Sequence, residues 1–172
     1  QIHIGHADLG KSGRRGPLAQ VREQRGMVQP RFQIRFLSTD HLSILLTRLL
    51  TWRDEAACAS TAADLARRAS LHEAFIELHG ALGAGKTTFV RHLLHALGAS
   101  GRIKSPTYAV MEPYTLGPLE VSHFDFYRFT DAREGEDAGL RDVFGRPGLK
   151  LAEWPEHAAG RLRLPLGAIA QK

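Results

Sequence analysis

Residues 80–87 (GALGAGKT) constrain the fold of this chain more than any other segment, because they match the pattern G-x-x-x-x-G-K-[ST] at every defined position. Glycines in this pattern let backbone N–H groups turn inward around a phosphate group. A helix that starts directly afterwards points its positive end at the same anion. Residues 74–79 (AFIELH) read as a buried strand before the loop, and residues 86–97 read as a helix that ends at Gly98. The sequence therefore predicts a strand, a phosphate-binding loop and a helix in direct succession.

Strand-like and helical segments alternate along the rest of the chain. Residues 42–50 fit either a first strand or a short helix, and residues 54–68 read as a helix that Asp54 caps. The other predicted elements are strands at 108–114, 119–125 and 149–152, and a polar segment of helical tendency at 131–144. The alternation predicts an α/β fold, a three-layer P-loop NTPase sandwich around a largely parallel, mixed central sheet.

The distribution of charge separates the chain into two parts. Residues 1–35 hold seven basic and two acidic residues, whereas residues 36–172 hold sixteen of each. We expect residues 1–41 to be a basic leader, either disordered or a mis-annotated extension with Met27 as an internal start; a tail that touches RNA is the alternative. Residues 42–172 are expected to form a single domain. That domain lacks the net positive charge of a protein that binds nucleic-acid backbones by itself.

The chain carries no sign of a membrane protein. No apolar run reaches the roughly 18 residues that a bilayer span requires. The only cysteine, Cys58, excludes a disulfide within the chain and a cysteine-based metal site. A cytoplasmic protein is therefore expected.

The phosphate-binding loop predicts how a nucleotide would be bound. Lys86 supplies a positive charge to the terminal phosphates, and the Thr87 hydroxyl is placed to ligate Mg²⁺. The motif assigns binding to eight residues in all: Gly80, Leu82, Gly83, Ala84, Gly85, Lys86, Thr87 and Thr88.

A nucleotide-hydrolysing site also needs carboxylates for the metal and the attacking water. Asp125 and Glu153 each follow an apolar run directly, so each is a candidate at the C-terminal end of a strand. Thr107, after Ser105-Pro106, is a candidate sensor of the terminal phosphate. The alternatives are solvated charges at strand ends and an ordinary turn threonine. We interpret His123 as a packed or surface histidine and Trp154 as an anchor in the core or at its edge.

Several strings, taken in order, resemble one bacterial family. They are HGALGAGKTTFVRHLLHALG, KSPTYAVMEPY, HFDFYR, LRDVF and LAEWPEH, spread over residues 51–157. Together they resemble the TsaE (YjeE) family. The P-loop alone is common to very many proteins, but the set SPTY, HFDFYR and EWPE after a P-loop is far more specific.

The resemblance implies a small ATPase with Mg²⁺ and ATP as cofactors. It implies a role in making N6-threonylcarbamoyladenosine in tRNA, by binding the TsaD–TsaB complex and resetting it through ATP hydrolysis, with tRNA contacted only indirectly. Carried over by motif, the catalytic residues are Lys86, Glu153, Asp125 and Thr107, the metal residues are Thr87 and Glu153, and Glu55 lies near the nucleotide. ATP rather than GTP rests on the resemblance alone.

The chain departs from the family pattern in two places. Ala81 stands where the family usually has Asp after the first glycine of the loop. Residues 160–172 do not resemble the strands that usually follow the EWP region, so the domain is expected to lack the last strands of the family fold.

Two other functions stay open. A small-molecule kinase on the same scaffold needs arginines that clamp the transferred phosphoryl group, and Arg128, Arg133, Arg141 and Arg146 lie scattered among acidic residues. A binding module that holds ATP without hydrolysing it is the third hypothesis. Phosphorylated product would favour the kinase, and binding without turnover would favour the module.

Overall fold

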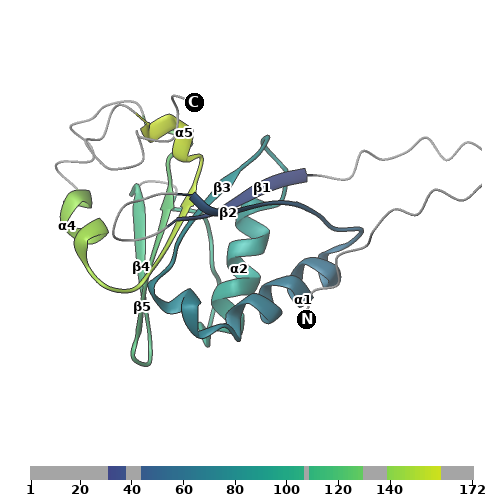
Figure 1. Cartoon of the computed structure of the whole chain (residues 1–172), viewed down its shortest axis with the longest axis horizontal. Helices are drawn as coiled ribbons and strands as arrows, with labels where there is room; N and C mark the ends of the chain where they lie inside the picture. The colour runs from purple at the N-terminus through teal and green to yellow at the C-terminus, as the bar shows by residue number, and fades with distance from the viewer. Residues whose placement is uncertain (1–30, 38–43, 107–108, 130–138, 160–172) are drawn as a thin grey trace, which may run out of the picture.

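The computed structural model of the chain describes residues 31–37, 44–106, 109–129 and 139–159 (Figure 1). Its elements are β1 (Arg31–Leu37), β2 (Ile44–Thr51), α1 (Glu55–Ala66), the short 3-10 helix η1 (Ala69–Glu73), β3 (Phe75–His79), α2 (Lys86–Ala96), β4 (Met111–Leu116), β5 (Leu119–Asp125), α4 (Leu140–Gly145), β6 (Leu149–Glu153) and α5 (Pro155–Ala158).

The described strands form one sheet with the order β2-β1-β3-β6-β5-β4. The central strands β3, β6 and β5 pair in parallel, whereas β1 with β2, β1 with β3, and β4 with β5 pair antiparallel. The predicted α/β fold with a mixed sheet is confirmed, but its parallel part is limited to these three strands. Their C-terminal ends meet at one edge, which is where ligands bind in open α/β sheets.

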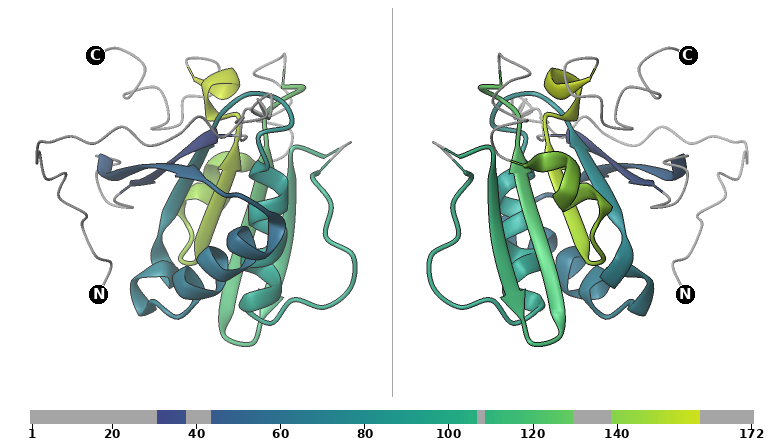
Figure 2. Two further views of the ribbon diagram at one scale, coloured as in Figure 1. Left: turned by 90° about the vertical axis from the view of Figure 1, so that its right-hand side faces the viewer. Right: turned by 90° about the vertical axis from the view of Figure 1, so that its left-hand side faces the viewer.

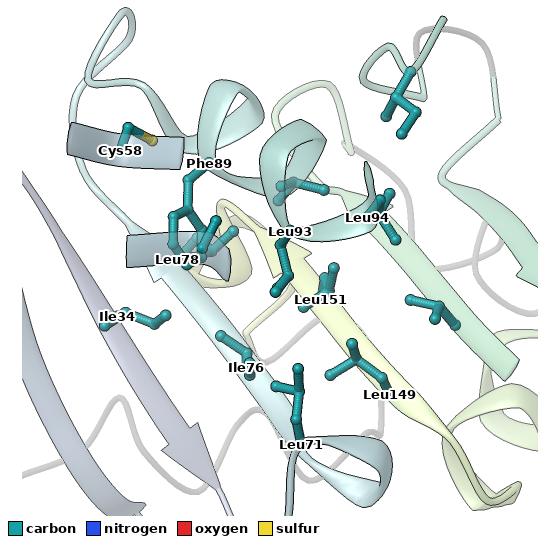
Figure 3. Packing of buried hydrophobic residues seen from close by; sticks show 14 of the residues in the cluster. Ile34, Cys58, Leu71, Ile76, Leu78, Phe89, Leu93, Leu94, Leu149 and Leu151 are labelled. Carbon is teal, nitrogen blue, oxygen red and sulfur yellow. The ribbon is translucent and has the colours of Figure 1, made fainter. Parts of the chain in front are cut away.

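Helices cover both faces of the sheet, which gives three layers (Figure 2). Helices α1 and α2 pack on one face, over a core that includes Ile76, Leu78, Phe89, Leu93 and Leu151 (Figure 3). Helix α4 packs on the other face, where buried Phe124, Phe126 and Leu140 gather with Phe75. Period-two alternation in β3 explains this division, because Ile76 and Leu78 point to one face and Phe75 to the other.

Strand β1 corrects the predicted start of the domain. Residues 31–37 lie between β2 and β3, and their Phe32, Ile34 and Leu37 are buried. The expectation that residues 1–41 form a leader outside the domain is therefore wrong for 31–37. Residues 1–30 and 38–43 lie outside the described residues, as does the C-terminal segment 160–172 on which the predicted lack of final strands rests.

Most other predicted elements match the structure within a few residues. The described part of the ambiguous segment 42–50, from Ile44 on, lies in strand β2. Asp54 caps α1, since its carboxylate oxygen Oδ1 accepts a hydrogen bond of 2.8 Å from the Ala57 N–H. Of the segment 131–144, the structure describes only the part from residue 139, which contains the start of α4.

Among the described helices, none combines the length and the apolar character that crossing a membrane requires.

Candidate nucleotide site

The phosphate loop joins the C-terminal end of β3 to the N-terminus of α2, as the motif requires. Gly80 is needed because a Cβ atom there would lie 2.7 Å from the Phe32 Cβ in the neighbouring strand β1. Gly85 caps α2 with a φ of 93°, a conformation that side chains with a Cβ rarely adopt. Both positions of the loop therefore favour glycine.

The Lys86 side chain is folded back onto the loop. Its ammonium group donates hydrogen bonds to the carbonyl oxygens of Gly80, at 2.6 Å, and Ala81, at 3.0 Å. It also lies 3.6 Å from the ring centroid of Trp154. Burial lowers the pKa of Lys86, although the nearby carboxylates, Glu153 foremost, act in the opposite direction. The lysine charge is therefore held inside the loop by carbonyl dipoles and an aromatic face.

Thr87, Glu153 and His123 form a hydrogen-bonded chain beneath the loop. The Thr87 hydroxyl donates to Glu153 Oε2 at 2.8 Å, and His123 Nε2 lies 2.9 Å from Glu153 Oε1. Glu153 and His123 are both buried, at 1% and 0% exposed. Because His123 Nδ1 is buried with no hydrogen-bond partner among the described residues, the tautomer with a proton on Nε2 fits best: it donates to the carboxylate and leaves no buried N–H unpaired. Both oxygens of Glu153 are thereby oriented.

Asp125 lies at the end of β5, opposite Glu153 in the register of β5 and β6. Its carboxylate accepts hydrogen bonds from the Ser105 hydroxyl, through Oδ2, and from the Tyr127 N–H, through Oδ1 at 2.9 Å. The aspartate thus ties Ser105 to the end of β5, beside Glu153 of the neighbouring strand β6.

Trp154 occupies a strained position directly after Glu153. It has a φ of 56°, the only positive φ among the described residues that are not glycine. Its ring packs against Tyr127 at 5.0 Å and His157 at 5.4 Å between centroids. The strain of a non-glycine residue in this conformation costs about 1–3 kcal/mol and is typical of functional sites. Together with the Lys86 contact, it makes Trp154 part of the site and not merely a core anchor.

His79, the last residue of β3, is held between two carboxylates. Its Nε2 lies 2.9 Å from Glu77 Oε2, and its Nδ1 lies 3.0 Å from Glu156 Oε2 in α5. Burial alone would lower the pKa of His79, but the hydrogen bonds to Glu156 and Glu77 outweigh it and raise the pKa above 6.5. Both ring nitrogens face acceptors, so the geometry requires the imidazolium. This ion pair fastens α5 to the strand that leads into the phosphate loop.

Two predicted site residues are not joined to this group. Glu55 lies at the start of α1, where its Oε1 is 3.0 Å from His92 Nε2 and 3.9 Å from Arg91 Nη1 in α2. It fastens α1 to α2, and no contact with the loop accompanies it among the described residues. Thr107 lies outside the described residues.

Sequence reasoning missed His123 and Trp154 as members of the site. His123 lies two residues before Asp125 in β5, so strand alternation places both on the face that carries the phosphate loop. That periodicity was the available signal for His123. The Trp154 contact with Lys86 joins two distant segments, and no local pattern indicates it.

The arrangement fits a magnesium nucleotide. In the described part of the chain no three side chains of His, Cys, Asp or Glu converge as a metal cage. Thr87 and Glu153 supply a hydroxyl and a carboxylate at one point, and the proton of Thr87 already points to Glu153, which leaves lone pairs of its oxygen for a cation. Loop N–H groups and Lys86 would hold the phosphates.

Known proteins resemble this chain in sequence over the region that holds the site. The model of the family "Threonylcarbamoyl adenosine biosynthesis protein TsaE" matches residues 52–170. The chain is 44% identical over 87 residues to the tRNA threonylcarbamoyladenosine biosynthesis protein TsaE of Haemophilus influenzae, which covers 51% of this chain and 55% of that protein. It is 42% identical over 79 residues to the Bacillus subtilis protein of the same name, which covers 46% and 49%.

The chain spans about half the length of these two relatives. Among solved structures, the crystal structure of YdiB from Bacillus subtilis aligns with a TM-score of 0.47 and 27% identity, over 64% of this chain and 66% of that one. The family match alone extends over well more than half of the residues and includes the phosphate loop, Asp125 and Glu153. This chain therefore belongs to the TsaE family.

Proposed function

We propose that this chain is a magnesium-dependent ATPase that serves the biosynthesis of N6-threonylcarbamoyladenosine in tRNA by acting on the TsaD–TsaB complex. The observation that carries the proposal is the 2.8 Å contact between the Thr87 hydroxyl and Glu153 at the base of a complete phosphate loop. The names of its relatives support the tRNA-modification role, since they are called tRNA threonylcarbamoyladenosine biosynthesis proteins.

The proposed reaction is attack of water on the terminal phosphorus of ATP. Lys86 would leave the carbonyl oxygens of Gly80 and Ala81 and donate to the phosphate oxygens instead. Thr87 and Glu153 would hold Mg²⁺, which neutralises charge that develops on the phosphate oxygens. His123 keeps Glu153 in one orientation, so the carboxylate needs no rearrangement as the charge develops.

The shielding of Lys86 supports a dependence of hydrolysis on the partner. Lys86 is buried at 4% exposed and held by three groups, so the free chain has to break these contacts before it can use the lysine. We expect slow hydrolysis by the chain alone and faster hydrolysis when the TsaD–TsaB complex stabilises the released lysine.

The test measures orthophosphate release from ATP by the full chain, alone and with TsaD–TsaB. We expect partner-stimulated release that Lys86→Ala abolishes. Arg53→Ala is the matched control, because Arg53 is a highly exposed cation whose ion pair is with Asp54. A folded chain that binds ATP but shows no turnover with the partners would favour a binding module, and a phosphorylated acceptor would favour a kinase; either result overturns the proposal.

A further inference from the structure

A cavity of about 510 Å³ lies between α2 and the segment that follows it. Its walls are Thr87, Arg91 and His95 of α2, and residues 101–105. The three helix residues are spaced by four positions, so they share one face of α2. This volume is in the range of sites for small ligands.

The walls of the cavity are fixed to the rest of the fold. Ile103 is 4% exposed and belongs to the core under α2. The His95 Nε2 atom lies 3.1 Å from the Gly101 carbonyl oxygen, which closes the end of the cavity far from the phosphate loop. At the near end, Ser105 is tied to Asp125. The cavity is therefore a built feature of the domain.

The lining is strongly cationic. Arg91, Arg102 and Lys104 contribute positive charges, and no carboxylate side chain is among the residues that line it. Two carboxylates lie behind these walls, but each already has donors: Glu55 faces Arg91 and His92, while Asp125 accepts from Ser105 and Tyr127. Residues 36–172 are neutral overall, so the fold has gathered cations here.

The position of the cavity indicates which anion it takes. Thr87 lines it and also contacts Glu153, so the cavity opens at the point where the metal and the terminal phosphate of a nucleotide would meet. Arginine forks match tetrahedral phosphate oxygens well. Ile103 is the only large apolar side chain of the lining, and the other lining side chains are polar or cationic, which suits a small anion.

We propose that this cavity is a phosphate-binding site that receives orthophosphate after it is cleaved from ATP. The inference rests on the proposed ATPase function. In the step concerned, the oxygen of water forms a bond to the terminal phosphorus, the bond from that phosphorus to the bridging oxygen breaks, and ADP keeps the electron pair. The orthophosphate carries the oxygen and one proton of water, the other proton is released to solvent, and the orthophosphate moves along the Arg91 face of α2.

The experiment titrates orthophosphate into the full chain saturated with ADP and Mg²⁺. The variant Arg91→Gln/Arg102→Gln is expected to weaken orthophosphate binding about tenfold, because each lost charge-assisted hydrogen bond contributes measurably. Arg53→Gln/Arg67→Gln removes the same charge outside the cavity and should leave the affinity unchanged. Thermal melting checks that all forms are folded.

A second measurement separates this inference from the function on which it rests. Quenched single-turnover reactions report cleavage of ATP, and inhibition by added orthophosphate reports occupancy of the cavity. Unchanged cleavage with about tenfold weaker inhibition in the cavity variant supports the site. No cleavage by the wild-type chain with its partners contradicts the proposed function. Normal cleavage with equal inhibition in both variants overturns the phosphate site.

Discussion

Thr87 and Glu153 stand 66 positions apart in the sequence, yet the threonine hydroxyl donates to the glutamate carboxylate at 2.8 Å. Parallel pairing of β3 with β6 brings them together, because Leu78 is in register with Glu153 and the phosphate loop begins directly after β3. The contact spans the first turn of α2 and the end of a neighbouring strand. This hydrogen bond can form only when the phosphate loop and the end of β6 are both in place.

Removing the charge of Glu153 tests its part in the reaction. Glu153→Gln keeps the shape of the side chain but offers Mg²⁺ a neutral amide, so we expect ATP hydrolysis to fall on the order of 100-fold. Binding of ATP, which depends mainly on the loop and Lys86, should fall much less. Glu120→Gln is the control, since Glu120 lies at the β4–β5 turn and bonds Thr115. Equal loss of binding and hydrolysis would mean that Glu153 serves to bind the magnesium nucleotide and has no separate part in its hydrolysis.

His123 is expected to act by positioning Glu153. His123→Phe leaves the buried Glu153 Oε1 without its donor, which should lower the free energy of unfolding by about 1–3 kcal/mol. It should also raise the Mg²⁺ concentration needed for half-maximal hydrolysis. Urea unfolding and magnesium titrations measure the two effects.

A matched pair of variants separates positioning from packing. His123→Gln can still donate to the carboxylate, so it should restore most of the magnesium affinity. His72→Phe alters an exposed histidine in η1 and should change neither quantity. If His123→Gln behaves like His123→Phe, packing and not the hydrogen bond is what Glu153 needs.

The His79 ion pairs predict a loss of stability in alkaline solution. The pKa of His79 is raised above 6.5 in the folded chain, so its contribution is complete below 6.5 and is lost as pH rises through the folded pKa. The pKa of Glu156 is lowered below 4.5: burial acts upward, but the His79 hydrogen bond prevails. Its contribution is lost only in acid, as pH falls through that lowered value. The free energy of unfolding in urea, measured from acid to alkaline pH, should therefore fall at both ends of the pH range.

Glu156→Gln is the variant that tests this assignment. It removes one carboxylate from His79 and leaves Glu77 in place, so the alkaline loss of stability should shrink without disappearing. If the alkaline loss of stability is as large in this variant as in the wild-type chain, another group causes it.

Gly80 is predicted to tolerate no side chain. Gly80→Ala brings its Cβ to 2.7 Å from the Phe32 Cβ, so β1 or the phosphate loop has to move. Gly98→Ala is a control for backbone strain alone, because Gly98 has a φ of +105° and open space around it. We expect Gly80→Ala to be about 1–3 kcal/mol less stable than Gly98→Ala in urea unfolding. Equal values would show that the strand yields easily.

Cys58 serves as a probe of opening between α1 and α2. Burial, with help from Glu55, raises the pKa of its thiol to about 11, and the side chain is 3% exposed. At about pH 8 a thiol reagent should therefore react far more slowly with the folded chain than with the chain in guanidinium chloride. Reaction of the folded chain at the rate of the unfolded one would contradict this burial.

The phosphate loop, the strand before it and the helix after it could be predicted from the sequence, because each depends only on residues that are adjacent in the chain. Gly80 to Thr87 are contiguous, and the hydrophobic periods of β3 and α2 adjoin them. Strand β1 was not predicted, although Phe32, Ile34 and Phe36 alternate with polar residues as in a strand. Arg31 and Arg35 led us to assign the segment to the basic leader. Net charge describes a segment's solubility, whereas alternation describes its packing, and here alternation was the relevant signal.

The rest of the site depends on contacts that sequence spacing does not encode. His123 reaches Glu153 only because β5 and β6 are neighbours, and Lys86 meets Trp154 only because the loop folds over the end of β6. Asp125 was predicted as a catalytic carboxylate, which stays a prediction, and its hydrogen-bond partners Ser105 and Tyr127 were not foreseen. Periodicity indicates which face a side chain occupies, but the order of the strands decides what it meets there.

The position of β1 determines where this chain can be shortened. It pairs with β2 on one side and with β3 on the other, and Phe32 forms the wall behind Gly80. A protein expressed from Met27 would keep this wall, whereas one started at residue 42 would lose an interior strand and leave β2 with no neighbour. Removing β1 would therefore take away the strand against which Gly80 of the phosphate loop packs.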